Sequence, residues 1–402
     1  MLKGAETVIP YSRQYIDEQD INAVIDVLKG DWLTCGPKVK AFEEALATQC
    51  NAEHAVAVSN GTAALHIACL AAGLKAGDHA VTSAVSFLAS ANCIEYTGAA
   101  TGFADIDPET ANLSPESLQC VWQPNSKAVV AVDFTGQPCD LPAISEFVKS
   151  HGGVVIEDAA HSIGASISYK GDFYKVGGMP WADMTTLSFH PVKTITCGEG
   201  GAILTNNRKL ADKCRLLRSH GMFKDKNLFQ GLGCDKLNEF GPWYYEMTEP
   251  GYNYRITDIQ CALGLSQLDK LESFIQRRRK IASLYKSLFS GSDMITPLTE
   301  REESRSAYHL YPVLIDFNKI RITRTQLIMK LKQQGIGSQV HYIPIPLQPY
   351  YRLKYGFTAR MFPYAVSYYS KCLSLPLYPS ITEDQIVKIA ETVLDIVSTN
   401  RK

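Results

Sequence analysis

The chain has 402 residues, enough for about two domains with a sizeable buried core. Its 40 Lys and Arg residues nearly balance 41 Asp and Glu, so the formal net charge is −1. Charge-driven binding to nucleic acid or to a membrane surface therefore has little support. With 46% hydrophobic and 20% charged residues, the composition is that of an ordered globular protein rather than a disordered one.

The eleven cysteines are scattered singly, without a C-x-x-C pair or a histidine at metal-ligand spacing. This usage favours a reducing compartment and predicts no metal site. Residues 1–6 lack the basic-then-apolar pattern of a secretory signal, and no stretch approaches the ~18 apolar residues of a membrane helix. We therefore expect a cytoplasmic protein without a membrane partner.

Short apolar runs alternate with helical stretches between residues 54 and 205. A helix is expected at 62–72, where the capping cluster Ser59-Asn60-Gly61 precedes it and Gly73 ends it. Repeated strand–helix alternation favours an α/β fold with a mainly parallel sheet covered on both faces. The expected strands are 55–58, 80–82, 100–106, 128–134, 154–157, 185–189 and 202–205.

The second part of the chain begins with one long helical register at 258–289, which Gly291 ends. We place the domain boundary along this helix and predict a large α/β domain at 1–265 and a smaller α+β domain at 266–402. The smaller domain is expected to contain strands at 308–315 and 337–342, a Pro-rich stretch at 344–349, and helices at 325–334 and 383–397.

Three segments could carry chemistry at the carboxyl edge of the sheet, where open α/β sheets bind ligands. The strand at 154–157 leads directly to Asp158, and His161 follows three residues later. An aspartate in this position can equally be a helix N-cap. Lys193 lies between an apolar strand and a Gly-rich turn, where burial would lower its pKa and free a neutral amine for a Schiff base. Its stem could also simply run along apolar surface.

The third segment, residues 58–65, places Gly61 and Thr62 at a helix N-terminus, which is a phosphate cradle or an ordinary capped turn. Phe87 could lie on a planar ligand or belong to the core. Neither a P-loop nor a complete G-x-G-x-x-G occurs, because Gly231-Leu-Gly233 lacks the third glycine. Together, a phosphate cradle, an aromatic ring, a strand-end acid and a buried lysine are the four parts that a pyridoxal phosphate site requires.

At this point the sequence resembles the fold-type I pyridoxal-phosphate enzymes, and among them the DegT/DnrJ/EryC1/StrS sugar aminotransferases. The resemblance covers nearly the whole chain. The matching segments are 32–37 with Phe42-Glu43, Ser59-Asn-Gly-Thr62, Phe87, Asp105-Ile-Asp107, Glu157-Asp-Ala-Ala-His161, Ser188-Phe-His-Pro-Val-Lys193, Gly198-Glu-Gly-Gly201 and 251–258.

The resemblance implies a role for each matching residue. Lys193 looks like the lysine that binds pyridoxal 5′-phosphate covalently and shuttles the proton, and Asp158 looks like the partner of the pyridinium nitrogen. His161 stands where many relatives have Gln near the ring hydroxyl, and Phe87 would cover the ring. The phosphate would be held by Gly61, Thr62 and Ser188. Asn253 resembles a residue that reaches the other subunit's phosphate, which implies a homodimer with shared sites.

Residues 335–344 and 348–351 look like the branch of the family that acts in pseudaminic acid biosynthesis. This likeness implies transfer of an amino group from glutamate to the C4 keto group of UDP-2-acetamido-2,6-dideoxy-β-L-arabino-hex-4-ulose, with His341 and His190 in the sugar site. The alternatives are an aminotransferase for another nucleotide-linked 3- or 4-ketosugar, a carbon–sulfur lyase, and a catalytically silent binding regulator. The family's dehydratases are disfavoured, because they have His in place of Lys193.

Overall fold

The computed structural model describes residues 8–233 and 240–402. Residues 1–7 and 234–239 lie outside the described part, so the prediction that residues 1–6 lack the pattern of a secretory signal concerns residues outside it. In the described part, no helix combines the length and the apolar character needed to cross a membrane.

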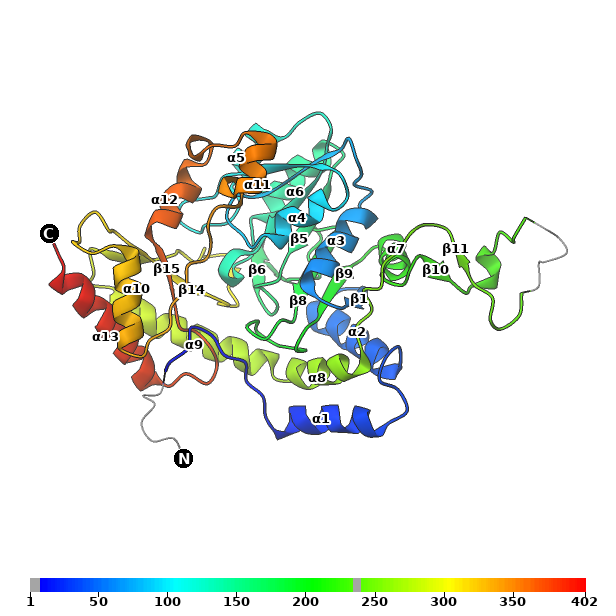
Figure 1. The fold of residues 1–402 in the computed structure, drawn as a ribbon, viewed down its shortest axis with the longest axis horizontal. Coiled ribbons are helices and arrows are strands. Elements are labelled where there is room, and N and C mark those ends of the chain that lie inside the picture. Colours follow the sequence, from blue (N-terminus) through cyan, green and yellow to red (C-terminus); the bar gives the residue numbers. More distant parts are fainter. Residues whose placement is uncertain (1–7, 234–239) are drawn as a thin grey trace.

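A seven-stranded sheet in the order β1-β9-β8-β5-β4-β2-β3 forms the centre of the molecule (Figure 1). Only β9 runs against its neighbours, and the other pairs are parallel. The predicted α/β fold with a mainly parallel sheet is therefore confirmed. The strands are β1 (His54–Val58), β2 (His79–Ser83), β3 (Ala100–Ala104), β4 (Ser126–Val132), β5 (Val154–Asp158), β8 (Met184–Ser188) and β9 (Gly201–Thr205).

Helices bury both faces of this sheet, as its apolar strands require. The alternation within β1 shows this, because Ala55 and Ala57 belong to one hydrophobic cluster while Val56 and Val58 belong to the other. One face is covered by α3 (Gly61–Ala71), α4 (Ala89–Glu95) and α7 (Arg208–Arg218). The other is covered by α2 (Pro37–Cys50), α5 (Pro115–Val121), α6 (Leu141–Ser150) and α8 (Asp258–Leu268).

The predicted single helix at 258–289 is wrong, because it is interrupted between α8 and α9 (Leu271–Phe289). A tertiary contact lies at the break. Lys270 Nζ lies 2.6 Å from Asp17 Oδ1 and 2.9 Å from the fully buried Asp20, at the start of α1 (Glu18–Lys29). The periodic pattern of apolar residues cannot reveal such a contact, because it reflects only residues that are close together in the sequence.

A second hydrophobic core lies around a three-stranded antiparallel sheet in the order β12-β14-β15. Along α9 the side chains change from the first core, which ends at Ile275, to the second, which begins at Ile281. The domain boundary after residue 265 stays a prediction. The second core is built from β12 (Ile295–Pro297), β14 (Tyr311–Ile315), β15 (Cys372–Leu375), α10 (Arg324–Gln333) and α13 (Glu383–Thr399).

Two strand predictions in this region need correction. The strand predicted at 308–315 begins only at Tyr311, because Tyr308 has a φ of 48° and its loop bonds to the turn at 134–136. The strand predicted at 337–342 does not form. That segment makes only an isolated bridge, from Gln339 to Ser374, and it leads into the Pro-rich stretch.

The remaining elements are short. A hairpin-like arm carrying β10 (Met222–Phe223) and β11 (Glu246–Met247) projects away from the body of the molecule (Figure 1). A further three-stranded sheet and two short helices complete the fold: β13 (Ser304–Arg305), β6 (Ser166–Tyr169), β7 (Asp172–Lys175), α11 (Pro349–Tyr355) and α12 (Pro363–Lys371).

Candidate active site

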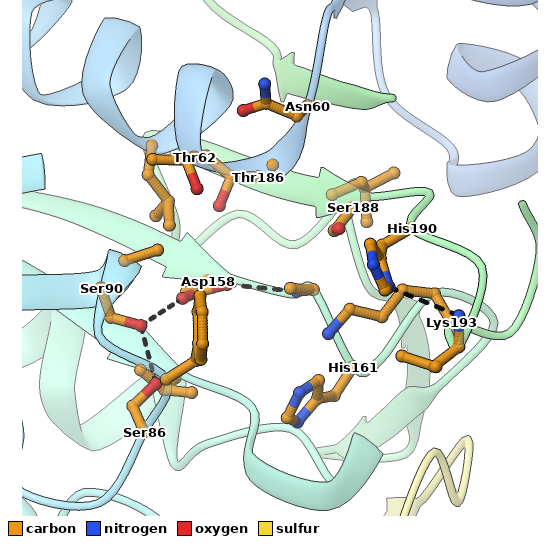
Figure 2. Close-up of a pocket in the computed structure, with 18 of the residues that line it drawn as sticks. Asn60, Thr62, Ser86, Ser90, Asp158, His161, Thr186, Ser188, His190 and Lys193 are labelled. Carbon is orange, nitrogen blue, oxygen red and sulfur yellow. Dashed lines mark hydrogen bonds between the residues drawn. The ribbon is translucent and has the colours of Figure 1, made fainter. Parts of the chain in front are cut away.

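A cavity of about 710 Å³ opens at the sheet edge where β1, β5 and β8 end. It brings together nine of the ten residues singled out in the sequence. Figure 2 labels six of them: Thr62, Asp158, His161, Ser188, His190 and Lys193. Asn253 is the exception, because it is exposed at the base of the arm, where it bridges to Ser219. The nine residues are Gly61, Thr62, Phe87, Asp158, His161, Ser188, His190, Lys193 and His341.

Asp158 is buried at the end of β5, and its carboxylate is held by two donors. Ser90 Oγ donates to Oδ2 at 2.6 Å, and the amide of Ala160 donates to Oδ1 at 3.2 Å. Burial raises the pKa of the Asp158 carboxyl, while these two bonds and the charge of Lys193 work in the opposite direction. The hydrogen bonds therefore favour an ionised acid at a site where burial disfavours one.

Ser90 is itself part of a chain that sequence reasoning missed. Its hydroxyl lies 2.7 Å from Ser86 Oγ, and because Ser90 donates its proton to a carboxylate, Ser86 must be the donor in this pair. Both serines line the cavity. A signal was present, since the two serines lie on either side of Phe87, where the chain leads from β2 into the first turn of α4.

Lys193 lies half-buried on the turn that follows β8, and its amide donates to the carbonyl of His190 at 2.8 Å. Its amine reaches into the cavity between Asp158 and His161 (Figure 2). Burial lowers the pKa of the Lys193 amine to about 8, although the neighbouring Asp158 charge raises it. At pH 7 roughly a tenth of this amine is then neutral and nucleophilic, far more than for a lysine with an ordinary pKa of about 10.4.

The N-terminus of α3 faces the same cavity. Asn60 caps the helix by accepting from the amide of Ala63 at 2.8 Å. A Cβ at Gly61 would lie 2.8 Å from Ser188 Cβ and 3.0 Å from its hydroxyl, so only glycine keeps this space open. Free amides, the positive end of the helix dipole and the hydroxyls of Thr62 and Ser188 make this a site that can bind a phosphate-sized anion.

Three histidines lie along the opposite wall, and all of them are uncharged. Burial and the nearby Lys193 charge lower the pKa values of His161 and His309 well below the usual range, and that of His341 to about 4. His341 Nδ1 lies 2.8 Å from Ser374 Oγ. His309 had no local signal, because it lies in a stretch whose pattern predicts a strand. His190 is exposed at the rim, with its Nδ1 3.5 Å from the amide of Val192.

Aromatic rings line the mouth of the cavity. Phe87 is 56% exposed, and its ring centroid lies 6.1 Å from that of Tyr342. An exposed Phe at a cavity mouth is available to a ligand rather than to the core. In the described residues, no group of three or more His, Cys, Asp or Glu side chains could hold a metal ion. The cavity therefore combines a nucleophilic amine, a buried acid, an anion site and an aromatic surface.

Comparison with known proteins identifies relatives over the whole length. Residues 14–394 match the DegT/DnrJ/EryC1/StrS aminotransferase family. The chain is 40% identical over 399 residues to the spore coat polysaccharide biosynthesis protein SpsC of Bacillus subtilis, covering 99% of each chain. It is 35% identical over 398 residues to the UDP-4-amino-4,6-dideoxy-N-acetyl-beta-L-altrosamine transaminase of Campylobacter jejuni, covering 98% of this chain and 99% of that one.

A solved structure extends this likeness to three dimensions. Helicobacter pylori PseC, an aminotransferase involved in the biosynthesis of pseudoaminic acid, superposes with a TM-score of 0.87 at 30% sequence identity. The match covers 98% of this chain and 100% of that one, so both the sheet and the smaller region are shared.

Proposed function

Since this chain belongs to the DegT/DnrJ/EryC1/StrS aminotransferase family and is a pyridoxal-phosphate-dependent sugar aminotransferase, we propose that its substrate is a UDP-linked 4-keto-6-deoxy sugar. Specifically, glutamate gives its amino group to C4 of UDP-2-acetamido-2,6-dideoxy-β-L-arabino-hex-4-ulose, a step in pseudaminic acid biosynthesis. The observation that carries the chemistry is the half-buried Lys193 amine lying with Asp158 in one cavity. The names of the Campylobacter and Helicobacter relatives support the choice of sugar.

The residues present fit the cofactor that this family uses. The space kept open at Gly61 beside the Ser188 hydroxyl would take its phosphate, with Thr62 as a further donor. The Asp158 carboxylate would hold its ring nitrogen, and Phe87 would cover its ring. Lys193 would bind it covalently. When bound, pyridoxal 5′-phosphate supplies an aldehyde that accepts an amino group and a ring that withdraws electrons from the adjoining carbon.

The chain's own side chains would then hold and move the protons of the reaction. Asp158, whose ionised form is favoured by hydrogen bonds from Ser90 and Ala160, would hold a proton on the ring nitrogen. Once displaced by the amino donor, Lys193 Nζ would be a free amine whose lowered pKa suits it to take the proton from the donor's α-carbon and to return it later. Because the three histidines are neutral, they add no positive charge that would lower the Lys193 pKa further.

A second substrate class is supported by a specific finding. The Bacillus relative is more similar to this chain than the Campylobacter transaminase, at 40% against 35% identity, and it carries a different name. Another nucleotide-linked 3- or 4-ketosugar is therefore the alternative substrate. The catalytic roles of Lys193 and Asp158 would be the same for either sugar.

We further propose a cytoplasmic homodimer with shared sites. The ten cysteines in the described part of the chain are free thiols, which suits a reducing compartment. Asn253 lies outside the cavity of its own chain and at the base of the projecting arm, which suits a contact with a second subunit.

A half-reaction assay tests the substrate. The enzyme is first converted with glutamate to its amino form, and each of a panel of 4-keto and 3-keto UDP- and dTDP-sugars is then added alone. We expect the UDP-linked 4-keto sugar named above to restore the absorption of the aldehyde form fastest. Faster recovery with a 3-keto or dTDP-linked sugar would overturn this substrate, and no recovery with any sugar would overturn the proposed ketosugar reaction.

A further inference from the structure

His309 is buried against His161 although the two residues are far apart in the sequence. Their ring centroids lie 4.4 Å apart at an interplanar angle of 40°, and both residues line the cavity. His309 is 4% exposed and His161 is 6% exposed. At this separation the rings touch, so neither can turn freely without moving the other.

Each of these histidines has a buried nitrogen without a partner. In the described part of the chain, Nδ1 of His161 and Nδ1 of His309 make no hydrogen bond. A buried polar atom that lacks a partner destabilises the folded protein, so such atoms in native structures usually serve a ligand or a mechanism. Two of them on adjacent rings, in a cavity that holds Lys193, point to a functional arrangement.

The backbone that carries His309 is fixed from one side by the turn at 134–136. The amide of Leu310 donates to the carbonyl of Thr135 at 3.2 Å, and the amide of Ala307 donates to the carbonyl of Gly136 at 2.8 Å. Gly136 has a φ of 106°, and a Cβ there would lie 2.9 Å from both the His161 carbonyl oxygen and the His309 amide nitrogen. Glycine is therefore required where the two histidine-bearing segments meet.

Arg278 of α9 fixes the same loop from the other side. Its guanidinium is buried, and Nη1 donates to the carbonyls of Tyr308 and His309 at 3.2 Å each and to that of Leu377 at 3.3 Å. A buried arginine bound to carbonyl oxygens keeps its positive charge close to His309. Burial lowers the pKa of His309, and the charges of Lys193 and Arg278 act in the same direction.

We propose that His309 is a positioning residue that fixes the orientation of the His161 ring, and that Arg278 holds His309 in place. The two rings are in contact, so the His309 ring restricts rotation of the His161 ring. His309 thereby determines which edge of the His161 ring faces the bound cofactor. This inference rests on the proposed placement of the cofactor beside Asp158.

The test uses the cofactor-loaded enzyme without sugar or glutamate. The pH titration of the lysine-bound cofactor's absorption band is compared in wild type, His309→Phe, His161→Phe and the double variant. His309→Phe keeps an aromatic ring but removes both nitrogens. We expect it to shift the titration midpoint by about half a pH unit or more, and the double variant to add little to the shift of His161→Phe.

A second pair of variants distinguishes a specific effect of His309 from a general folding defect. His309→Gln is compared with His79→Gln, because His79 is an equally buried histidine, also 4% exposed, which lies outside the cavity and pairs with Ser126. Only His309→Gln should shift the midpoint. Wild-type midpoints in both His309 variants with cofactor bound, or shifts that simply add to that of His161→Phe, would overturn the inference. A sugar assay that fails while the coupled shifts persist would overturn the proposed substrate alone.

Discussion

Burial pushes Lys193 and Asp158 toward their neutral forms, and the attraction between their charges acts against this. The Asp158 pKa also depends on Ser90, whose hydroxyl donates a hydrogen bond that acts against the effect of burial. The charge of the acid is thus set by a residue on a different element, α4. Proximity to Lys193 alone does not determine it.

The lowered pKa of Lys193 leads to a pH dependence for cofactor capture. Only the neutral amine attacks an aldehyde, and the fraction of neutral amine rises with pH until the pKa is passed. With the Lys193 pKa at about 8, the rate of pyridoxal phosphate binding to the cofactor-free protein should rise up to about pH 8 and then level off. Stopped-flow absorbance between pH 6 and 10 measures this rate.

Nα-acetyl-lysine serves as the control, because its side-chain amine has an ordinary pKa of about 10.4 and its rate should still climb through pH 9. Lys193→Ala should show no covalent capture at any pH, and borohydride should fix no cofactor to this variant. A plateau reached only near pH 10 in wild type would show that burial does not lower the Lys193 pKa. A borohydride-stable adduct in Lys193→Ala would remove the lysine from its assigned role.

At the scale of elements, the sequence predicted those features that local pattern determines. The strand before Asp158 and the capped helix after Asn60 were both visible, because apolar runs and capping residues are local signals. The break before Leu271 and the loop at His309 were not, because both lie at contacts between segments that are distant in the sequence. Nine of the residues that line the cavity could therefore be named in advance, whereas the contact between His161 and His309 could not.

The turn at 134–136 offers a stability test of the loop that carries His309. Gly136→Ala introduces strain at a positive φ and a Cβ that lies 2.9 Å from three backbone atoms. Gly152→Ala is the matched control, since Gly152 also has a positive φ, of 70°, but a Cβ added there would meet no atom within 4 Å. The strain alone costs about 1–2 kcal/mol, and the clash should add at least about 2 kcal/mol at Gly136.

Urea unfolding of the two variants measures this difference in the free energy of unfolding. Near-equal values for Gly136→Ala and Gly152→Ala would mean that the loop at 307–310 can move away from the turn without cost. In that case the turn at 134–136 would not hold the loop rigidly, and His309 would not be fixed in position by this contact.

For the whole molecule, the cavity contains every singled-out residue except Asn253, which is exposed and bridges to Ser219. If two copies associate so that each Asn253 completes the other's site, a catalytic site draws Lys193 and Asn253 from different chains. Dimers with two-fold symmetry then have two equivalent composite sites. In a monomeric enzyme, every residue of a site comes from the same chain.

Mixing two inactive variants tests whether Lys193 and Asn253 of one site come from different chains. In a dimer formed from Lys193→Ala and Asn253→Ala subunits, one site receives both damaged residues and the other receives both intact ones. After complete exchange of equal amounts, half of the dimers are mixed, so about a quarter of wild-type activity should return. Exchange is verified with differently tagged subunits, and each variant mixed with itself is the control. If mixed dimers are recovered on the tags but remain as inactive as the separate variants, Asn253 does not complete a partner's site.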